Sequence, residues 1–547
     1  MAELAQPLVP LSQPGHWAEV NHLISYGNRL WFANSVFFNN HNSADIYSYG
    51  PVTGDTRLEQ HLFSQGAGHP VVADGLLYWP FEDPRFSADL GEYMVTNGDQ
   101  WQWHILPQGE AFHVHAMASH GDALWASTGA WSGGVQRSSD GGKTWGLVYG
   151  YPTPARRVSR VTNLVSSGDQ LFAEVMAVHE QGSKVLRWDK ALAQAADFKP
   201  VNSWPNGKRV KALTAFQGHV YGVNQNPDDS YGVWRTDGEH TAPVMALDGY
   251  RISAFAATDQ VLWAISSTPG AGYLWRSEDG LTWAAVQQFT TLRPLDVAVH
   301  GGQVYVGGQG DDGQGVLWGP SPTGGAGAPV AASDGQRADG EQALVAMPQP
   351  MVASEDPAQP IASLLAQVET VLSDPTTYTG GNAQAVLATA LMPLGLTHDP
   401  AVGHQLAQYL QTPLPVESAQ VFENKVSVLA TDVTQWYLLW AMGLNGHGQV
   451  PLDLLQAPWT EPANDREKYW HPAPAAAWVA GQLGRQNETL DRAVIGAMVE
   501  RLTTQDDPLW LVGDFVGALH SLTGQQFGYD VVAWQEWWED PNGASAS

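Results

Sequence analysis

The sequence predicts a multidomain protein, an all-β, seven-bladed propeller followed by an all-α domain. A turn followed by a short apolar strand recurs seven times at near-constant spacing before residue 320. A segment rich in Gly, Ala, Pro and Ser then interrupts the hydrophobic pattern. After this segment, apolar residues repeat with the period of an α-helix instead of that of a β-strand.

The repeated unit has the length of a propeller blade. The first apolar residues of the recurring strands are Leu30, Leu76, Leu124, Leu171, Val220, Leu262 and Val304, and successive ones are 42 to 49 residues apart. Repeats of about 40–50 residues that contain several short strands are typical of propeller blades. We therefore predict a seven-bladed propeller over residues 1–320.

The last repeat lacks a fourth strand, because the chain turns to PSPTGG after Gly319. Residues 4–11 (LAQPLVPL) precede the first repeat and are long enough to supply that strand. Residues 342–348 (QALVAMP) are the alternative. Either segment removes an open sheet edge by closing the ring.

Two turns within the repeats contain Ser, Asp, Gly, Thr and Trp in the same order. These residues are Ser138, Asp140, Gly142, Thr144 and Trp145 in the first turn, and Ser277, Asp279, Gly280, Thr282 and Trp283 in the second. The pattern resembles the Asp-box of sialidase-type (BNR) propellers. The resemblance implies a structural role, in which Asp accepts backbone hydrogen bonds across the turn and Trp packs between sheets. Sialidase activity does not follow from it.

The second half of the chain is expected to contain a flexible linker at 321–358 and an α-helical domain at 359–547. Apolar periodicity predicts helices at 360–373, 382–392, 401–411, 418–442, 473–484, 488–503, 508–522 and 530–539. The segment LTGQQFGYDVVAWQEWW (522–538) resembles the closing segment of bacterial HEAT-like repeat proteins. An ordinary helical bundle is the alternative.

Composition excludes several classes of protein and site. The chain has 55 acidic and 26 basic residues, which argues against a nucleic-acid or anionic-membrane binder. It has no cysteine, so disulfides and Cys-ligated metals are excluded. No apolar run reaches membrane-spanning length. The absence of cysteine beside 24 tryptophans favours an extracytoplasmic bacterial protein (periplasmic, surface or secreted) whose leader is absent from this chain.

Basic residues gather where the first strand of several repeats begins, which is where propellers meet ligands. They are His113, His115, Arg160, Arg209, Lys211, Arg251 and Arg293. The planar arginine side chain matches carboxylate and sulfate groups, so we expect these residues to bind an anion at the propeller mouth. Trp131 and the loop residues Phe37, Phe38, Phe81 and Phe86 are expected to form an apolar platform beside them. Alternatively, the basic residues pair with neighbouring carboxylates and tie the blades together.

His113 and His115 form an H-x-H pair, which places both rings on one side of a strand. His69 and His41 are possible third ligands for a metal, but neither is clearly placed by the sequence. We therefore expect no metal and no cofactor.

The sequence contains no P-loop, dinucleotide fingerprint, zinc-protease motif or nucleophile elbow. The leading hypothesis is a non-enzymatic binding or assembly protein that engages an anionic ligand or a protein partner. The alternative is a carbohydrate-active enzyme, a lyase or hydrolase, that acts on an acidic polysaccharide at the propeller mouth. In a lyase, His113 or a tyrosine acts as base while an arginine neutralises the uronate carboxylate.

Overall fold

The chain divides into two compact units, Met1–Pro350 and Met351–Ser547. The computed structural model describes residues 4–321, apart from 5, 16, 36–42, 63, 85–90, 107–112, 130–131, 152, 154–157, 178–183, 190–197 and 269, and residues 361–540, apart from 374–389, 396, 398, 412–419, 424–425, 448, 460–470 and 486–491. The predicted linker lies outside these residues except for position 321, as does the alternative closing segment 342–348. The predicted domain boundaries stay predictions.

The first unit is a β-propeller whose sheets consist of antiparallel strands that follow one another in the sequence, except where β1 pairs with β29, β6 with β8 and β12 with β15. Its strands are β1 (Leu8–Ser12), β2 (Glu19–Tyr26), β3 (Arg29–Ser35), β4 (Ala44–Tyr49), β5 (Thr56–Leu62), β6 (Ser64–Ala67), β7 (Val71–Ala73), β8 (Leu76–Pro84), β9 (Gly91–Thr96), β10 (Trp101–Leu106), β11 (His113–His120), β12 (Ala123–Gly129), β13 (Gly134–Ser138), β14 (Gly146–Gly150), β15 (Ser159–Ser167), β16 (Gln170–Ala177), β17 (Lys184–Asp189), β18 (Lys199–Pro200), β19 (Arg209–Phe216), β20 (His219–Gln225), β21 (Tyr231–Thr236), β22 (Thr241–Pro243), β23 (Ile252–Ala257), β24 (Leu262–Thr268), β25 (Ala271–Ser277), β26 (Ala284–Phe289), β27 (Leu292–His300), β28 (Gln303–Gly310) and β29 (Gly315–Pro320), with a short 3-10 helix η1 (Met245–Leu247). A single residue pair, Gly129 with Arg160, joins β11–β14 and β15–β18 into one eight-stranded sheet.

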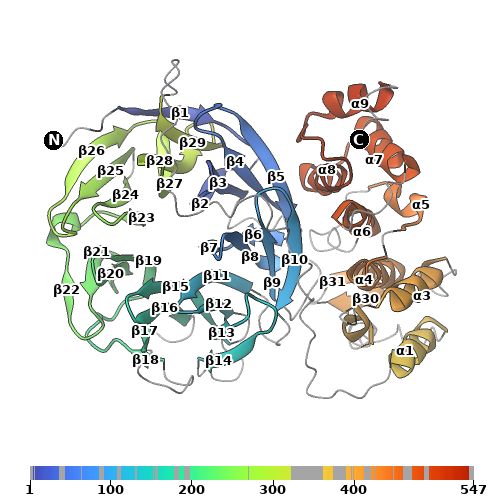
Figure 1. Cartoon of the computed structure of the whole chain (residues 1–547), viewed down its shortest axis with the longest axis horizontal. Coiled ribbons are helices and arrows are strands. Elements are labelled where there is room, and N and C mark those ends of the chain that lie inside the picture. Colours follow the sequence, from blue (N-terminus) through green and yellow to red (C-terminus); the bar gives the residue numbers. More distant parts are fainter. Residues whose placement is uncertain are drawn as a thin grey trace. The chain divides into compact units, whose positions relative to one another are not determined.

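The sheets form a ring, with β2, β7, β11, β15, β19, β23 and β27 nearest its centre (Figure 1). The N-terminal strand β1 closes the ring by pairing antiparallel with β29, so that Leu8 lies opposite Pro320. Gln287 also donates to the Leu8 carbonyl at 3.0 Å and accepts from the Leu8 N–H at 2.8 Å. The prediction that the N-terminal segment supplies the missing strand is confirmed, with Leu8–Ser12 as the paired residues.

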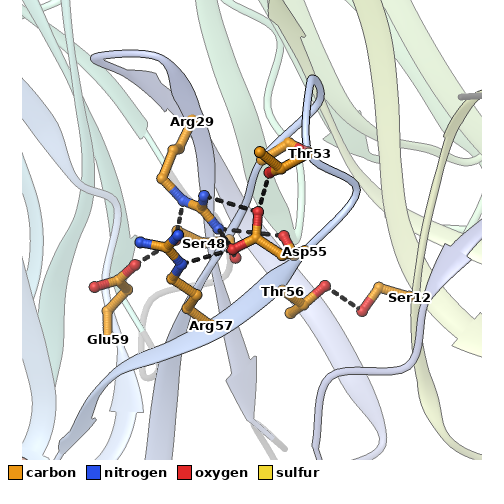
Figure 2. Close-up of polar contacts among 9 residues, drawn as sticks. Ser12, Arg29, Ser48, Thr53, Asp55, Thr56, Arg57 and Glu59 are labelled. Atoms are coloured by element: carbon orange, nitrogen blue, oxygen red, sulfur yellow. Dashed lines mark hydrogen bonds and ion pairs between the residues drawn. The ribbon is translucent and has the colours of Figure 1, made fainter. Parts of the chain in front are cut away.

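A polar network links strands of the first sheet, and a separate hydrogen bond joins this sheet to the closing strand (Figure 2). Arg29 of β3 donates to the Ser48 hydroxyl of β4 at 2.6 Å and to both carboxylate oxygens of Asp55 at 3.1 and 3.2 Å. The Thr56 hydroxyl of β5 donates to the Ser12 hydroxyl of β1 at 2.7 Å. The strand that closes the ring is therefore bonded to the last sheet through its backbone and to the first sheet through a side chain.

The two turns that resemble an Asp-box have similar hydrogen bonds. Asp140 accepts from the backbone N–H of Thr144 at 2.9 Å and from its hydroxyl at 2.6 Å. Asp279 accepts from the backbone N–H of Thr282 at 2.7 Å and from its hydroxyl at 3.0 Å. Trp145 is buried after the first turn. In each turn, the Asp side chain therefore accepts hydrogen bonds from backbone N–H groups that have no partner in a neighbouring strand.

Large apolar side chains fill the space between neighbouring sheets. Trp31 and Ala33 of β3 pack with Leu77 and Trp79 of β8 in one such cluster. Each buried large side chain contributes roughly 1.5–3 kcal/mol relative to an exposed one. Because the space between sheets is apolar core, polar groups that could bind a ligand lie near the strand ends and on the innermost strands.

The second unit is largely helical. Its helices are α1 (Ile361–Ser373), α3 (Pro400–Leu410), α4 (Ala430–Leu444), α5 (Leu452–Leu455), α6 (Pro472–Arg485), α7 (Arg492–Thr504), α8 (Leu509–Thr523) and α9 (Val531–Glu539). Helix α8 ends at Gly524, whose φ of 70° permits the left-handed cap. Helix α9 begins after Asp530, which accepts from the Ala533 N–H at 3.0 Å, and Trp534 is its one fully buried tryptophan. In the described part of the chain, no helix combines the length and apolar character needed to cross a membrane.

The predicted helix 418–442 is wrong in its first part. Residues Gln420–Glu423 (β30) and Val426–Leu429 (β31) pair as an antiparallel hairpin, and α4 starts only at Ala430. The hairpin sequence is rich in β-branched and aromatic residues, which favour strands over helices. Of the predicted helix 382–392, only 390–392 are described, and these residues are helical.

Candidate functional site

The innermost strands share an irregularity near their starts. The pairing register shifts in β2 after Asn21 and in β11 after Val114, and similar shifts occur in β15, β19, β23 and β27. Such β-bulges turn side chains out of the usual strand alternation. In β2 and β11 the bulged residues include His22 and His115, and the break between β6 and β7 contains His69. Consecutive sheets therefore each contribute a histidine at the corresponding place.

These histidines lie next to one another. Nδ1 of His22 is 3.3 Å from Nδ1 of His69, and the two rings meet edge-on with centroids 4.5 Å apart. The His69 N–H donates to the His115 carbonyl at 2.8 Å. The rings of His113 and His115 stack with centroids 5.3 Å apart. Four imidazoles thus form a continuous cluster across three innermost segments.

Glu82 of β8 places its carboxylate beside this cluster. Its Oε1 is 3.3 Å from Nδ1 of His115, 4.0 Å from Nδ1 of His113 and 3.8 Å from Nη1 of Arg160. The Glu82, His113 and His115 side chains are only 9%, 6% and 6% exposed. Nε2 of His115 is buried and has no hydrogen-bond partner among the described residues. Three basic side chains therefore converge on one buried oxygen, each at or beyond the long end of hydrogen-bond distances.

Burial governs the protonation of this cluster. It lowers the pKa of His115, although the neighbouring Glu82 carboxylate opposes that shift. It also lowers the pKa of His69, and nearby His115 adds to that effect. Burial acts to raise the pKa of Glu82, but His115, His113 and Arg160 outweigh it and lower that pKa below the usual range. Glu82 is thus an anion at neutral pH beside a neutral His115.

Close backbone packing fixes the cluster. A Cβ added at Gly68 would lie 2.5 Å from the His115 carbonyl oxygen, so only glycine permits this approach between neighbouring sheets. A Cβ added at Gly129 would likewise lie 2.7 Å from Cγ of Arg160. The two glycines therefore allow the backbones to come close enough for Glu82, His115 and Arg160 to meet.

A second basic group consists of Arg209 and Lys211 of β19 and Arg251, which directly precedes β23. Nζ of Lys211 is 5.2 Å from the ring centroid of Tyr231, and Cζ of Arg251 is 5.5 Å from the same centroid. In the described part of the chain, no carboxylate lies within 4.0 Å of these three cations. Nε of Arg209 is buried without a hydrogen-bond partner there. We call Arg209, Lys211 and Arg251 the cationic cluster.

Glu174 of β16 is the carboxylate that acts on this cluster from a longer distance. Its Oε1 accepts from the Thr162 hydroxyl at 2.6 Å. Burial raises the pKa of Glu174 to about 7, so about half of these carboxyls are uncharged at neutral pH. Burial, Arg251 and Arg209 together lower the pKa of Lys211 to about 8. Positive charge therefore exceeds negative charge around Tyr231.

The other residues predicted for the site belong neither to the cationic cluster nor to the histidine cluster. Arg293 donates to Glu19 of β2 at 2.8 Å, and its side chain is 50% exposed. Trp131, with Phe37, Phe38 and Phe86 of the predicted aromatic platform, lies outside the described residues. Phe81 is 2% exposed and packs in the core between sheets, so its predicted place on an exposed platform is wrong.

The sequence prediction missed Glu82, His22 and Glu174. For the histidines a signal exists, because His69 and His115 each lie six residues before the glycine of the next turn and His22 lies five before its glycine. For the two glutamates no such signal exists. They come from the second strand of one sheet and meet basic residues of the following sheet, which only the packing of the sheets reveals.

Comparisons with known proteins find similar folds among solved structures. The solved structure of YCF48 bound to D1 peptide matches with a TM-score of 0.41 and 15% identity, over 58% of this chain and 96% of that one. The β-propeller domain of the Trilobed protease from Pyrococcus furiosus matches with a TM-score of 0.40 and 8% identity, over 55% and 95%. The computationally designed Ika8 protein matches with a TM-score of 0.37 and 14% identity, over 58% and 100%. No protein-family model and no curated protein sequence match the chain. At these levels the similarities say nothing about what this chain binds.

Proposed function

We propose that the protein is a non-enzymatic binding or assembly protein whose propeller binds an anionic group of a protein partner at the cationic cluster. The observation that supports this proposal is that Lys211 and Arg251 lie over Tyr231, with Arg209 close enough to affect Lys211, and that no carboxylate lies within 4.0 Å of the three among the described residues. Such cations repel one another in the free protein, and a bound anion relieves that repulsion.

The protonation of Lys211 and Glu174 supports the same proposal. The lowered pKa of Lys211, about 8, means that its positive charge is disfavoured by burial and by the two arginines. Glu174 offers little compensation, because burial raises its pKa to about 7. Groups whose ionisation is disfavoured in this way are typical of functional sites.

The chemistry of the cluster favours a carboxylate on a protein partner. Each charge-assisted hydrogen bond to an anion contributes about 1.5–3 kcal/mol, so two or three contribute about 3–9 kcal/mol before association losses, and a single carboxylate binds more weakly than micromolar. The net charge of −29 repels long polyanions such as nucleic acids. It interferes less with a single carboxylate that reaches a local positive site.

We further propose the finer fold assignments. Counting β11–β14 and β15–β18 as separate blades gives seven blades, the predicted number, and the Asp-box hydrogen bonds support a sialidase-type (BNR) propeller. The HEAT-like character of the helical unit rests on its closing segment at 522–538. An extracytoplasmic location rests on the absence of cysteine beside 24 tryptophans.

Calorimetric titration of the full chain with a hexaglutamate peptide tests the function. Wild type is expected to bind, and Lys211→Ala/Arg251→Ala is expected to bind at least about tenfold more weakly, because two charge-assisted contacts are lost. Arg293→Ala is the matched control, since Arg293 already pairs with Glu19, and it should bind as wild type does. Equal binding by the double variant, or none by a folded wild type, contradicts the proposal.

The carbohydrate-active alternative is tested with polygalacturonate. A lyase produces unsaturated uronate ends that absorb ultraviolet light, and a hydrolase produces new reducing ends. Neither is expected from this protein. Turnover that is lost in His113→Ala would replace the binding proposal by an enzymatic one.

A further inference from the structure

The histidine cluster, of which His113 and His115 are buried, plays no part in the proposed anion site. Within it, Glu82, His113 and His115 each offer a ligand atom, and these atoms lie within 4.8 Å of one another. All three side chains are buried. They come from β8 and β11, which belong to neighbouring sheets.

We propose that Glu82, His113 and His115 form a binding site for a divalent transition-metal ion of the zinc class. This proposal is independent of the anion site, and it reverses the expectation from sequence, which lacked a third ligand. The third ligand is Glu82.

The spacing of the ligand atoms suits such an ion. Two ligand atoms bound to one zinc ion at about 2.0–2.2 Å lie roughly 3–3.5 Å apart. Oε1 of Glu82 is 3.3 Å from Nδ1 of His115, which already meets this distance, and 4.0 Å from Nδ1 of His113. The ligand atoms of His113 and His115 lie within 4.8 Å of each other, so metal binding requires the His113 ring to move closer to the other two ligands.

The chemistry of the ligands selects the class of ion. Two imidazoles and one carboxylate suit Zn²⁺, Co²⁺, Ni²⁺ and Fe²⁺, whereas Ca²⁺ and Mg²⁺ prefer sites made of oxygen atoms. The absence of cysteine leaves imidazole and carboxylate as the metal ligands that this chain can offer.

The site is also held in position before any ion binds. His115 lies at the β-bulge of β11, and its carbonyl accepts from the His69 N–H at 2.8 Å. Contact with Gly68 fixes the same peptide group. A ligand held by its backbone loses little freedom when it binds a metal, which increases affinity.

Arg160 is the feature that opposes cation binding. Its Nη1 is 3.8 Å from Oε1 of Glu82, which is longer than a hydrogen bond, and its side chain is 29% exposed. The guanidinium can therefore turn toward solvent when a metal ion takes its place. Removal of this cation should tighten metal binding, an effect that misfolding cannot imitate.

The test is a titration of the metal-free, untagged full chain with Co²⁺, followed by its visible ligand-field absorption and by competition with Zn²⁺. Wild type is expected to bind one ion per chain. His115→Ala and Glu82→Gln are expected to weaken binding by at least about 10–100-fold, since even residues behind the ligands have effects of that size. The matched control is His240→Ala, which removes a histidine that is 89% exposed and pairs only with Asp237 among the described residues.

Arg160→Met keeps the measurement decisive if a ligand variant fails to fold. It should bind Co²⁺ more tightly than wild type while keeping the wild-type circular dichroism. Affinity in Arg160→Met no higher than in wild type, wild-type affinity in folded His115→Ala or Glu82→Gln, or loss of binding in His240→Ala overturns the proposal.

Discussion

A buried arginine of the helical unit and the cationic cluster of the propeller differ in whether their positive charges have carboxylate partners. Arg501 of α7 is 2% exposed, and its guanidinium donates to both oxygens of Asp507 at 2.7 and 3.0 Å and to the carbonyls of Leu455 and Ala457. The cationic cluster has no carboxylate within 4.0 Å among the described residues. A cation that serves the fold is paired and hydrogen-bonded, so cations without such partners indicate a role outside folding.

The largest effect is expected where the cation is fully paired. Arg501→Met leaves the buried Asp507 carboxylate and two carbonyls without donors, and should destabilise the helical unit by about 3–5 kcal/mol. Urea unfolding followed by the helical circular dichroism signal measures it. Arg492→Met is the control, because Arg492 lies exposed over the Trp538 ring, where a cation–π contact contributes about 0.5–1 kcal/mol. Equal destabilisation by Arg501→Met and Arg492→Met would contradict the view that paired, buried cations stabilise the fold.

Removal of a paired cation in the propeller should also destabilise the fold, by less than removal of Arg501 does. Arg29→Met removes the bonds to Ser48 and to both oxygens of Asp55, which is partly exposed, so we expect a loss of about 1.5–3 kcal/mol (Figure 2). Unfolding followed by tryptophan fluorescence measures the loss. If the free energy of unfolding does not change, pairing with a carboxylate does not distinguish cations that stabilise the fold from cations that bind a ligand.

Anion binding should depend on pH through Lys211. The pKa of Lys211 is lowered to about 8, so its positive charge is lost as the pH rises through 8. Hexaglutamate affinity should fall by about 10–100-fold across this range, the equivalent of one charge-assisted contact of 1.5–3 kcal/mol. Lys211→Ala should abolish the dependence above pH 8, where Glu174, whose pKa is about 7, is already ionised. A pH-independent affinity in wild type would exclude Lys211 from the site.

The smallest expected change in stability is that of Lys211→Met. It is a stabilisation, whereas Arg501→Met and Arg29→Met destabilise the protein. Because the folded-state pKa of Lys211 is below its unfolded value, the charged lysine disfavours folding below pH 8, and this penalty disappears as the pH rises from about 8 toward 10.5. Lys211→Met should therefore stabilise the propeller by about 0.5–2 kcal/mol at pH 7, as removal of a strained functional group commonly does. Thermal unfolding at pH 7 and pH 10 measures it, and destabilisation at pH 7 would show that Lys211 serves the fold.

The same contrast explains how much could be predicted from sequence. The repeats, the strands and the closing N-terminal strand depend on local pattern and length, and the sequence predicted them. The basic residues of the innermost strands were found because they share a position within the repeat. Glu82 and Glu174 could not be found this way, since they reach their partners across the interface between sheets. The hairpin at 420–429 was missed because its alternation is short and adjoins a true helix.

The most direct measurement is the pKa of the Lys211 ammonium by NMR of the full chain, without and with hexaglutamate. The account predicts a value near 8 in the free protein and a clear rise toward the ordinary value of 10.5 when the peptide binds, because the carboxylate compensates the repulsion from Arg209 and Arg251. A value near 10.5 in the free protein, or one that the peptide leaves unchanged, would contradict the claim that the cationic cluster is uncompensated and binds an anion.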